Sequence, residues 1–169
     1  RPPRSTLFPY TTLFRSARTP EREDRFKWAG ELMRINYHLY KLTAREDVVV
    51  DSLDAARRYR VGVMRSDVRQ QYLQRNGFAH LVESSGNEAN FQKLLAGRVD
   101  LVPLPRGDAA RLCRKFGIDC ATLTPVLALD ALTVDLYMAF SPSTDDAVVE
   151  RLRRGYAALK AEGHLVDID

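Results

Sequence analysis

Long apolar runs, cysteine and clustered histidine are all scarce in this 169-residue chain. No run approaches the ~18 uncharged apolar residues that a membrane-spanning helix requires, so no such helix is predicted. The two cysteines, Cys113 and Cys120, are too few for a disulfide scaffold and lack the paired short spacings of a zinc site. The three histidines, His38, His80 and His164, are dispersed. We therefore predict neither a metal site nor a bound cofactor.

The charge of the chain does not favour nucleic-acid binding. The formal net charge is +4, but Arg1, Arg4 and Arg15 lie in an N-terminal stretch that carries no acid. Without these three residues, 23 basic residues stand against 22 acidic ones, which is a balance of +1. The remaining charges are interleaved, as in RTPEREDR and DAVVERLRR, whereas a nucleic-acid footprint needs Lys and Arg gathered on one face.

The stretch Thr6–Ser16, TLFPYTTLFRS, has no usable helical or strand periodicity. All eleven residues resemble the translation of a common short-read sequencing adapter. We therefore expect that residues 1–16 belong to no domain, that the native chain begins near Ala17, and that its N-terminus is missing together with any signal peptide. The alternatives are an extended strand or a signal-peptide remnant, although the stretch has no continuous apolar h-region and no small-residue cleavage site.

From Asp51 onward, short β-type runs alternate with helical runs, which predicts parallel strands joined by crossover helices. The expected strands are 60–64, 80–84 and 98–104, and the expected helices are 67–77, 87–97 and 108–117. Asp67 stands at the N-cap of the first helix and Gly77 just past its end.

Two further strands and one helix complete the predicted elements. Residues 131–141 alternate with period two and predict the longest strand. The last helix is expected to open at Ser143 or Thr144. Residues 26–42 are rich in aromatic and β-branched side chains and predict a strand with a kink at Gly30. Because no earlier strand is available to pair with this one, we expect it to be the edge of a truncated domain.

Several segments, by their order and spacing, resemble the family 3 extracellular solute-binding proteins, which are the periplasmic amino-acid-receptor components of ABC importers. They are RTPERE followed by FKW, DSLDAARRYRVGV before a helix, GRVD, and YMAFSPST before a long helix and EGHL. The resemblance implies an α/β fold of the periplasmic-binding-protein-like type II, in which two lobes with mostly parallel sheets close on a ligand like a hinged trap. It assigns residues 17–42 and 136–169 to an incomplete lobe one, and residues 43–135 to lobe two.

The resemblance also implies a ligand site in lobe one. The Thr-x-x-Arg element of the family falls on Thr19 and Arg22, and Arg22 corresponds to the usual clamp for an α-carboxylate. A planar guanidinium suits this role because it donates two parallel hydrogen bonds and stays charged when desolvated. The alternative is an exposed Arg22 paired with a neighbouring Glu. Trp28 or Tyr37 is the candidate aromatic floor, and the alternative for Trp28 is a core position.

In lobe two the family places a small Gly-Ser/Thr element at the turn after VGV, where backbone N–H groups and a helix N-terminus meet a carboxylate. Here Arg65, Ser66 and Asp67 occupy that turn. A carboxylate at Asp67 would repel an anionic ligand, and Arg65 could offset that charge or contact the ligand itself. The alternative is an ordinary Asp cap beside a solvated Arg65.

Cys113 and Cys120 are separated by six residues across a helix end. A periplasmic disulfide could join them if their Cα atoms approach within about 7 Å, and a free pair is the alternative.

The function implied by the resemblance is that of a non-enzymatic periplasmic component that captures a small polar ligand, amino-acid-like or a carboxylate. Its partner is the membrane permease of an ABC importer, and the complete protein is expected to be a monomer. One alternative is the sensory ligand-binding domain of a receptor. Another is a periplasmic enzyme on the same fold, for which Asp67 and Glu83 are the candidate carboxyl groups, although no second acid is placed beside either.

Overall fold

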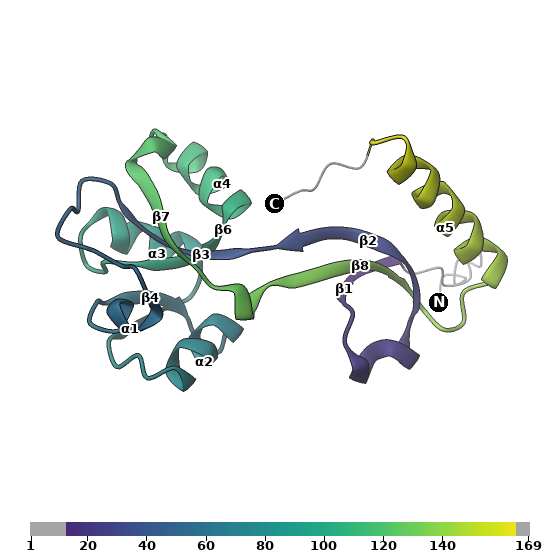
Figure 1. Ribbon diagram of the computed structural model, residues 1–169, viewed down its shortest axis with the longest axis horizontal. Coiled ribbons are helices and arrows are strands. Elements are labelled where there is room, and N and C mark those ends of the chain that lie inside the picture. The colour runs from purple at the N-terminus through teal and green to yellow at the C-terminus, as the bar shows by residue number, and fades with distance from the viewer. Residues whose placement is uncertain (1–12, 165–169) are drawn as a thin grey trace, which may run out of the picture. The chain divides into compact units, whose positions relative to one another are not determined.

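In the computed structural model, which describes residues 13–164, the chain forms two units (Figure 1). Unit 2 comprises Asn36–Thr133, and the described part of unit 1 comprises residues 13–35 and 134–164. Unit 2 therefore begins before Thr43, where the sequence places the start of lobe two. None of the helices between residues 13 and 164 has both the length and the apolar character needed to cross a bilayer.

Unit 2 is built on strands that follow one another in the order β5-β4-β6-β3-β7. They are β3 (Tyr37–Leu42), β4 (Val61–Met64), β5 (Leu81–Ser84), β6 (Val102–Pro105) and β7 (Leu123–Ala128). β4 and β5 are parallel, and a parallel bridge between Val61 and Leu101 brings β4 beside β6. β3 runs antiparallel to both β6 and β7. The α/β fold class is thus confirmed, and the predicted strands of this unit all form.

Helices cover both faces of the unit 2 sheet (Figure 1). They are α1 (Leu53–Ala56), α2 (Val68–Arg75), α3 (Asn87–Leu95) and α4 (Arg106–Phe116), with 3₁₀ turns η2 (Cys120–Thr122) and η3 (Asp130–Leu132). Consecutive strand residues point to opposite faces, so Leu39 joins the core beneath α1 and α2, whereas Tyr40 joins the core beneath α3 and α4.

Local sequence signals explain where these helices begin and end. The Asp67 carboxylate accepts a hydrogen bond from the Arg69 amide at 2.9 Å and caps α2, and the chain turns left-handed at Gly77 and Gly97, at φ +79° and +65°. Helix α4 begins at Arg106, which is earlier than the predicted Asp108. Pro105 precedes it with φ −65°, a value already suited to a helix start.

A buried carboxylate joins the start of β4 to the segment before β6. Asp100 accepts hydrogen bonds from the backbone amide of Arg60 and from its Nε at 3.0 Å each, and Arg45 Nη1 adds another at 3.1 Å. Burial alone would raise the pKa of the Asp100 carboxyl, but these hydrogen bonds outweigh it, and the pKa lies below its usual value. The aspartate of GRVD is therefore a structural residue of unit 2.

The two cysteines form a disulfide. The Cα atoms of Cys113 and Cys120 are 5.4 Å apart, which is within the range that a bridge requires. The bond ties the C-terminal half of α4 to η2, so of the two alternatives left open by the sequence, the structure has the bridged one.

Unit 1 holds a three-stranded antiparallel sheet with β8 in the middle. Its elements are β1 (Leu13–Ala17), η1 (Pro20–Arg25), β2 (Lys27–Ile35), β8 (Val134–Phe140) and α5 (Asp146–Ala161). The expectation that residues 26–42 lack a partner is wrong, because β2 pairs with β8 and β3 pairs with β6 and β7. The strand predicted to be the longest corresponds to β8, which is shorter than β2. The cap of α5 is Asp145, whereas the sequence predicts that this helix opens at Ser143 or Thr144.

Part of the N-terminal stretch takes its place in this sheet. The sequence assigns residues 1–16 to no domain, whereas Leu13–Ala17 forms β1 and pairs antiparallel with β8. The side chains of Leu13 and Phe14 are exposed. Main-chain hydrogen bonds hold a strand at a sheet edge whatever its side chains are, so this pairing does not require a native sequence.

Removing the disulfide is expected to destabilise unit 2 without unfolding it. A short closed loop contributes about 2 kcal/mol of unfolding free energy by restricting the unfolded chain. The variant Cys113→Ala/Cys120→Ser should therefore show an unfolding free energy lowered by that amount, seen as a lower urea midpoint at a similar slope. Reduction of the parent chain should give the same shift and leave the variant unaffected. A reductant effect equal in both proteins would contradict this assignment.

Replacing Asp100 is expected to have a pH-dependent effect on stability. Asp100→Asn should lower the unfolding free energy by about 2 kcal/mol at neutral pH, because Arg60 and Arg45 lose a charged acceptor. Since the folded-state pKa of Asp100 lies below its unfolded value, the stabilisation is complete above a pH of roughly 4 and is lost as the pH falls through the folded-state pKa. Urea unfolding from pH 7 to pH 2 should show the unfolding free energies of the two proteins converging. A difference in free energy that does not change with pH would contradict this.

Candidate functional site

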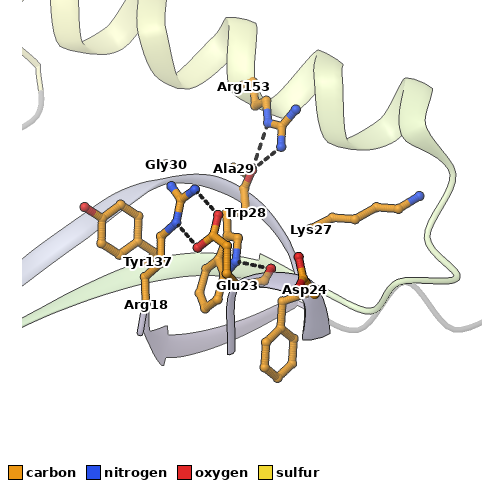
Figure 2. A pocket seen from close by; sticks show the side chains of 10 residues that line it. Arg18, Glu23, Asp24, Lys27, Trp28, Ala29, Gly30, Tyr137 and Arg153 are labelled. Carbon is orange, nitrogen blue, oxygen red and sulfur yellow. Dashed lines mark hydrogen bonds and ion pairs between the residues drawn. The ribbon is translucent and has the colours of Figure 1, made fainter. Parts of the chain in front are cut away.

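Unit 1 contains a pocket of about 480 Å³ (Figure 2). The residues that line it are Arg18, Glu23, Asp24, Phe26, Lys27, Trp28, Ala29, Gly30, Tyr137 and Arg153. They come from the segment around η1, the first half of β2, the middle of β8 and one turn of α5. Its volume lies in the range of small-molecule sites, which makes it the candidate site of this unit.

Close packing of α5 on β2 forms one wall of the pocket. A Cβ atom on Gly30 would lie 2.7 Å from atoms of the Tyr156 ring, so only glycine lets the helix approach this near. β2 also shifts register between Trp28 and Gly30, which confirms the predicted kink. Arg153 then reaches the Trp28 carbonyl, with Nε at 2.8 Å and Nη2 at 2.6 Å. The wall is thus fixed by backbone contact and by hydrogen bonds to the strand.

Arg18 lies against two aromatic rings of the pocket. Its guanidinium carbon is 5.7 Å from the centroid of the Trp28 ring and 5.6 Å from that of Tyr137, and the two rings meet edge to face. Trp28 is 5% exposed, and its Nε1 donates to the Glu23 carbonyl at 3.0 Å. The rings therefore hold the guanidinium plane in one place, as cation–π contacts do.

Glu23 neutralises this guanidinium. Arg18 Nε donates to Glu23 Oε2 at 2.8 Å, and Nη2 donates to Oε1, so the pair is bidentate (Figure 2). The hydrogen bond from Arg18 holds the pKa of the Glu23 carboxyl below its usual value. Both side chains are nearly half exposed, so the net stabilisation from the pair is small. Another carboxylate can exchange with Glu23 at little cost.

Each cationic side chain that lines the pocket already has a carboxylate partner. Arg18 pairs with Glu23 and Arg153 pairs with Glu150. Lys27 Nζ donates to Asp146 at 2.6 Å and to the Thr144 carbonyl at 2.7 Å. A ligand carboxylate can therefore bind here by exchange with one of these partners. Among residues 13–164 there is no cluster of His, Cys, Asp and Glu that could hold a metal ion. The pocket is thus suited to a small organic ligand with a carboxylate and an apolar body.

The sequence-predicted residues of unit 1 lie in and beside this pocket. Trp28 lines it, whereas Thr19 and Arg22 do not. The Arg22 guanidinium donates to Ser16 Oγ at 3.1 Å, and its amide donates to the Thr19 carbonyl at 2.9 Å. The Thr19 hydroxyl bonds Glu21 and lowers the pKa of that carboxyl.

Sequence reasoning missed Arg18 and Tyr137. Arg18 directly precedes the TPER string, and this adjacency was a usable signal. Tyr137 has the opposite parity to the apolar positions Leu136 and Met138, which places it on the other face of β8. Its neighbour across the sheet could not be read from the sequence.

In unit 2 the turn after β4 satisfies its own polar groups. The Ser66 amide donates to Gln70 Oε1 at 2.6 Å, and Gln70 Nε2 donates to Glu83 Oε1 at 2.6 Å. Arg65 Nε donates to Glu83 Oε2 at 2.8 Å, and the Arg65 side chain is 76% exposed. Glu83 thus accepts hydrogen bonds from the side chains of Arg65 and Gln70, and these hydrogen bonds lower the pKa of its carboxyl.

A buried guanidinium lies behind this turn. Arg69 is 5% exposed, and its Nε donates to Asp67 Oδ1 at 2.5 Å. Its Nη1 donates to Asn87 Oδ1 and to the Pro103 carbonyl, each at 3.0 Å, and its charge lies 5.5 Å from the Tyr37 ring centroid. Burial would raise the pKa of the Asp67 carboxyl, but the hydrogen bonds from Arg69 prevail and lower it. Asp67 is therefore ionised and already paired.

No family model matches the chain, and no curated protein matches its sequence. Solved structures do match. A histidine kinase sensor domain with similarity to periplasmic binding proteins superposes with a TM-score of 0.65 at 16% identity, over 90% of this chain and 65% of that one. The chain has a periplasmic-binding-protein-like fold. The sequence-based expectation of this fold is confirmed.

Two further matches are amino-acid-binding proteins. One is the substrate-binding protein AbpA of an amino acid ABC transporter from Streptococcus pneumoniae bound to L-arginine, with a TM-score of 0.62 at 17% identity over 88% of this chain and 61% of that one. The other is an ancestral arginine-binding protein bound to arginine, with a TM-score of 0.60 at 16% identity over 87% and 64%. The chain thus spans less than two thirds of the length of these structures.

The backbone of the unit 2 turn carries strain that glycine would relieve. Ser66 has φ +59°, and it is the only non-glycine residue with positive φ among residues 13–164. A side chain in this conformation costs about 1 kcal/mol. We expect Ser66→Gly to leave the urea unfolding free energy equal or raise it by up to about 1 kcal/mol, whereas Ser66→Val should lower it. A loss of stability in the glycine variant would show that the Ser66 side chain is itself required.

Proposed function

We propose that this chain is the solute-binding component of an ABC importer and that it binds a small polar ligand with a carboxylate group. The observation that carries the proposal is the unit 1 pocket, in which Arg18 is held against Trp28 and Tyr137 on a periplasmic-binding-protein-like fold. The solved structures that share this fold include amino-acid-binding proteins of ABC transporters. The pocket has the charge and the aromatic walls that such a ligand requires.

Binding proceeds by exchange of one carboxylate for another. The ligand carboxylate takes the two hydrogen bonds that Arg18 gives to Glu23, and the Glu23 side chain moves into solvent, where it is already nearly half exposed. The cost is small because the surface pair is weak, and since one bidentate pair replaces another, the favourable free energy comes from covering the two aromatic rings with the ligand body. Asp24 also lines the pocket and can receive an ammonium group of the same ligand.

The residues that the sequence resemblance singles out enter the proposal as follows. Arg22, with Thr19 beside it, is a second carboxylate ligand adjacent to the pocket, and Trp28 is its aromatic wall. In unit 2, Arg65 and Ser66 are further polar groups that we propose for ligand contact, since the Arg65 side chain is exposed and its pair with Glu83 can open. Asp67 is already paired with buried Arg69 and keeps a structural role.

The localisation and partners of the protein are proposed on the same basis. We propose a periplasmic, non-enzymatic and monomeric protein that delivers its ligand to a membrane permease and has no nucleic-acid partner. The stretch Thr6–Ser16 is of adapter origin in this proposal. The proposed lobes follow the two units, because β3 (Tyr37–Leu42), which the sequence assigns to lobe one, pairs within the sheet of unit 2.

A sensory role is the second candidate, because one of the matching structures is a histidine kinase sensor domain. The two roles differ in what the gene encodes beside this fold. A native reading frame that continues into a membrane-spanning helix and a signalling domain supports the sensor, and one that encodes a free binding protein supports the importer.

Binding should be measured by isothermal titration calorimetry of the chain with amino acids, organic acids and polyamines. Arg18→Lys keeps the charge but loses the planar fork, so it is expected to weaken the best ligand about tenfold. Arg22→Lys tests the clamp implied by the resemblance. Arg151→Lys, at an exposed position of α5, is the matched control and should bind as the parent does.

The outcomes show which arginine binds the carboxylate and whether the chain binds a solute. A loss with Arg22→Lys alone would place the carboxylate outside the pocket, and unchanged binding in all three variants would make charge alone, without the planar fork, responsible. Binding of polyamines in preference to every carboxylate would contradict the ligand class. If no compound of the panel gives a measurable heat of binding, solute binding by this chain is contradicted.

A further inference from the structure

Unit 2 contains a second pocket, of about 500 Å³, that shares no residue with the pocket of unit 1. It lies among β3, β7, η2 and the first half of α4, elements that Figure 1 shows within this unit. The residues that line it are His38, Tyr40, Arg106, Ala109, Ala110, Cys120, Leu123 and Pro125. The proposed function uses none of them.

Three polar side chains of this pocket have no hydrogen-bond partner within residues 13–164. Tyr40 is 6% exposed, and no hydrogen bond forms at its hydroxyl there. His38 Nδ1 is fully buried and unpartnered. His38 and Tyr40 lie two residues apart on β3 and so face the same side of the sheet, with ring centroids 6.2 Å apart. His38 Nδ1 is enclosed by the protein itself, whereas the Tyr40 hydroxyl is not enclosed and is open to a ligand in the pocket.

The third polar group is a cation without a counter-charge. Within the described part of the chain Arg106 forms no ion pair, and no acidic residue lines the pocket. Burial raises the pKa of the Tyr40 hydroxyl, and the charge of Arg106 partly offsets the rise, so the guanidinium is near enough to act on the same ligand. Arg18 in unit 1, by contrast, already has the Glu23 carboxylate as its partner. Arg106 is exposed to solvent, so it can receive an anion without first breaking an ion pair.

Apolar groups make up the rest of the pocket. Ala109 and Ala110 come from α4, Leu123 and Pro125 from β7, and the sulfur of Cys120 is locked in the disulfide. A bare inorganic anion would leave these surfaces uncovered, whereas an organic body would bury them. The site therefore combines one guanidinium, one hydroxyl and one imidazole at a polar end with an apolar wall.

We propose that this pocket is a binding site for a small organic carboxylate with an apolar body. Arg106 and the Tyr40 hydroxyl donate to the carboxylate, the His38 ring lies beside them in the lining, and the body lies against α4 and β7. The site is additional to the solute pocket of unit 1, and it does not depend on the transport role.

Benzoate is the probe that tests this site, and its neutral isostere benzamide is the chemical control. Titration of the chain followed by NMR should give saturable binding of benzoate and at least about tenfold weaker binding of benzamide, because the amide loses the charge-assisted bonds. Arg106→Gln should weaken benzoate about tenfold or more, and Tyr40→Phe about threefold to tenfold. Arg114→Gln makes the same change at an exposed position of the same helix and should have no effect.

Two further measurements keep the test specific. Tyr40→Phe removes a hydroxyl that has no partner, so its urea unfolding free energy should not fall, and a loss of binding in this variant cannot then come from unfolding. In Arg18→Lys the benzoate-induced NMR shifts of Tyr40 and Arg106 should match those of the parent, even where binding at the unit 1 pocket is weakened, which separates the two sites. Equal binding of benzamide, equal weakening by Arg114→Gln, loss of the shifts at Tyr40 and Arg106 in Arg18→Lys, or absence of benzoate binding would each overturn the proposal.

Discussion

The guanidinium of Arg69 is the charge around which unit 2 is arranged. It is almost fully removed from water, so it must be neutralised and hydrogen-bonded within the protein, and Asp67, Asn87 and the Pro103 carbonyl meet that demand. These partners come from the starts of α2 and α3, which follow the parallel strands β4 and β5, and from within β6. Loss of either member of the Asp67–Arg69 pair would leave the other charge buried alone, at a cost of about 3–5 kcal/mol.

Elements whose signals are local could be predicted from the sequence. Helix α2 begins after Asp67 and is followed by Gly77 because a carboxylate can cap nearby amides and glycine tolerates a positive φ, and both effects act within a few residues. The strand Val61–Met64 is a short apolar run that is buried on both faces. Because such signals alternate along the chain, the α/β fold class followed from them before any contact was known.

Contacts between distant segments could not be predicted in the same way. The partner of β2 is β8, about one hundred residues later, and nothing near Trp28 specifies that strand. The same holds for the pocket of unit 1, where Tyr137 and Arg153 meet Arg18 and Trp28 only after the strands have paired and α5 has packed on Gly30. Arg22 and Arg18 stand four residues apart in one charged run, and only the stacking on two rings distinguishes them.

Two arginine–carboxylate pairs in this chain show how burial decides what an ion pair can do. Asp67 and Arg69 are shielded from solvent, so separating them exposes two unpaired charges to a medium that cannot stabilise them, and the pair holds the turn in one state. Arg18 and Glu23 have similar bidentate geometry but lie nearly half in water, which can replace either partner. In our proposal the second pair releases its carboxylate for that of a ligand. Chemical identity alone would have assigned both pairs the same role, and it is solvent exposure that separates the structural pair from the pair that we propose to bind.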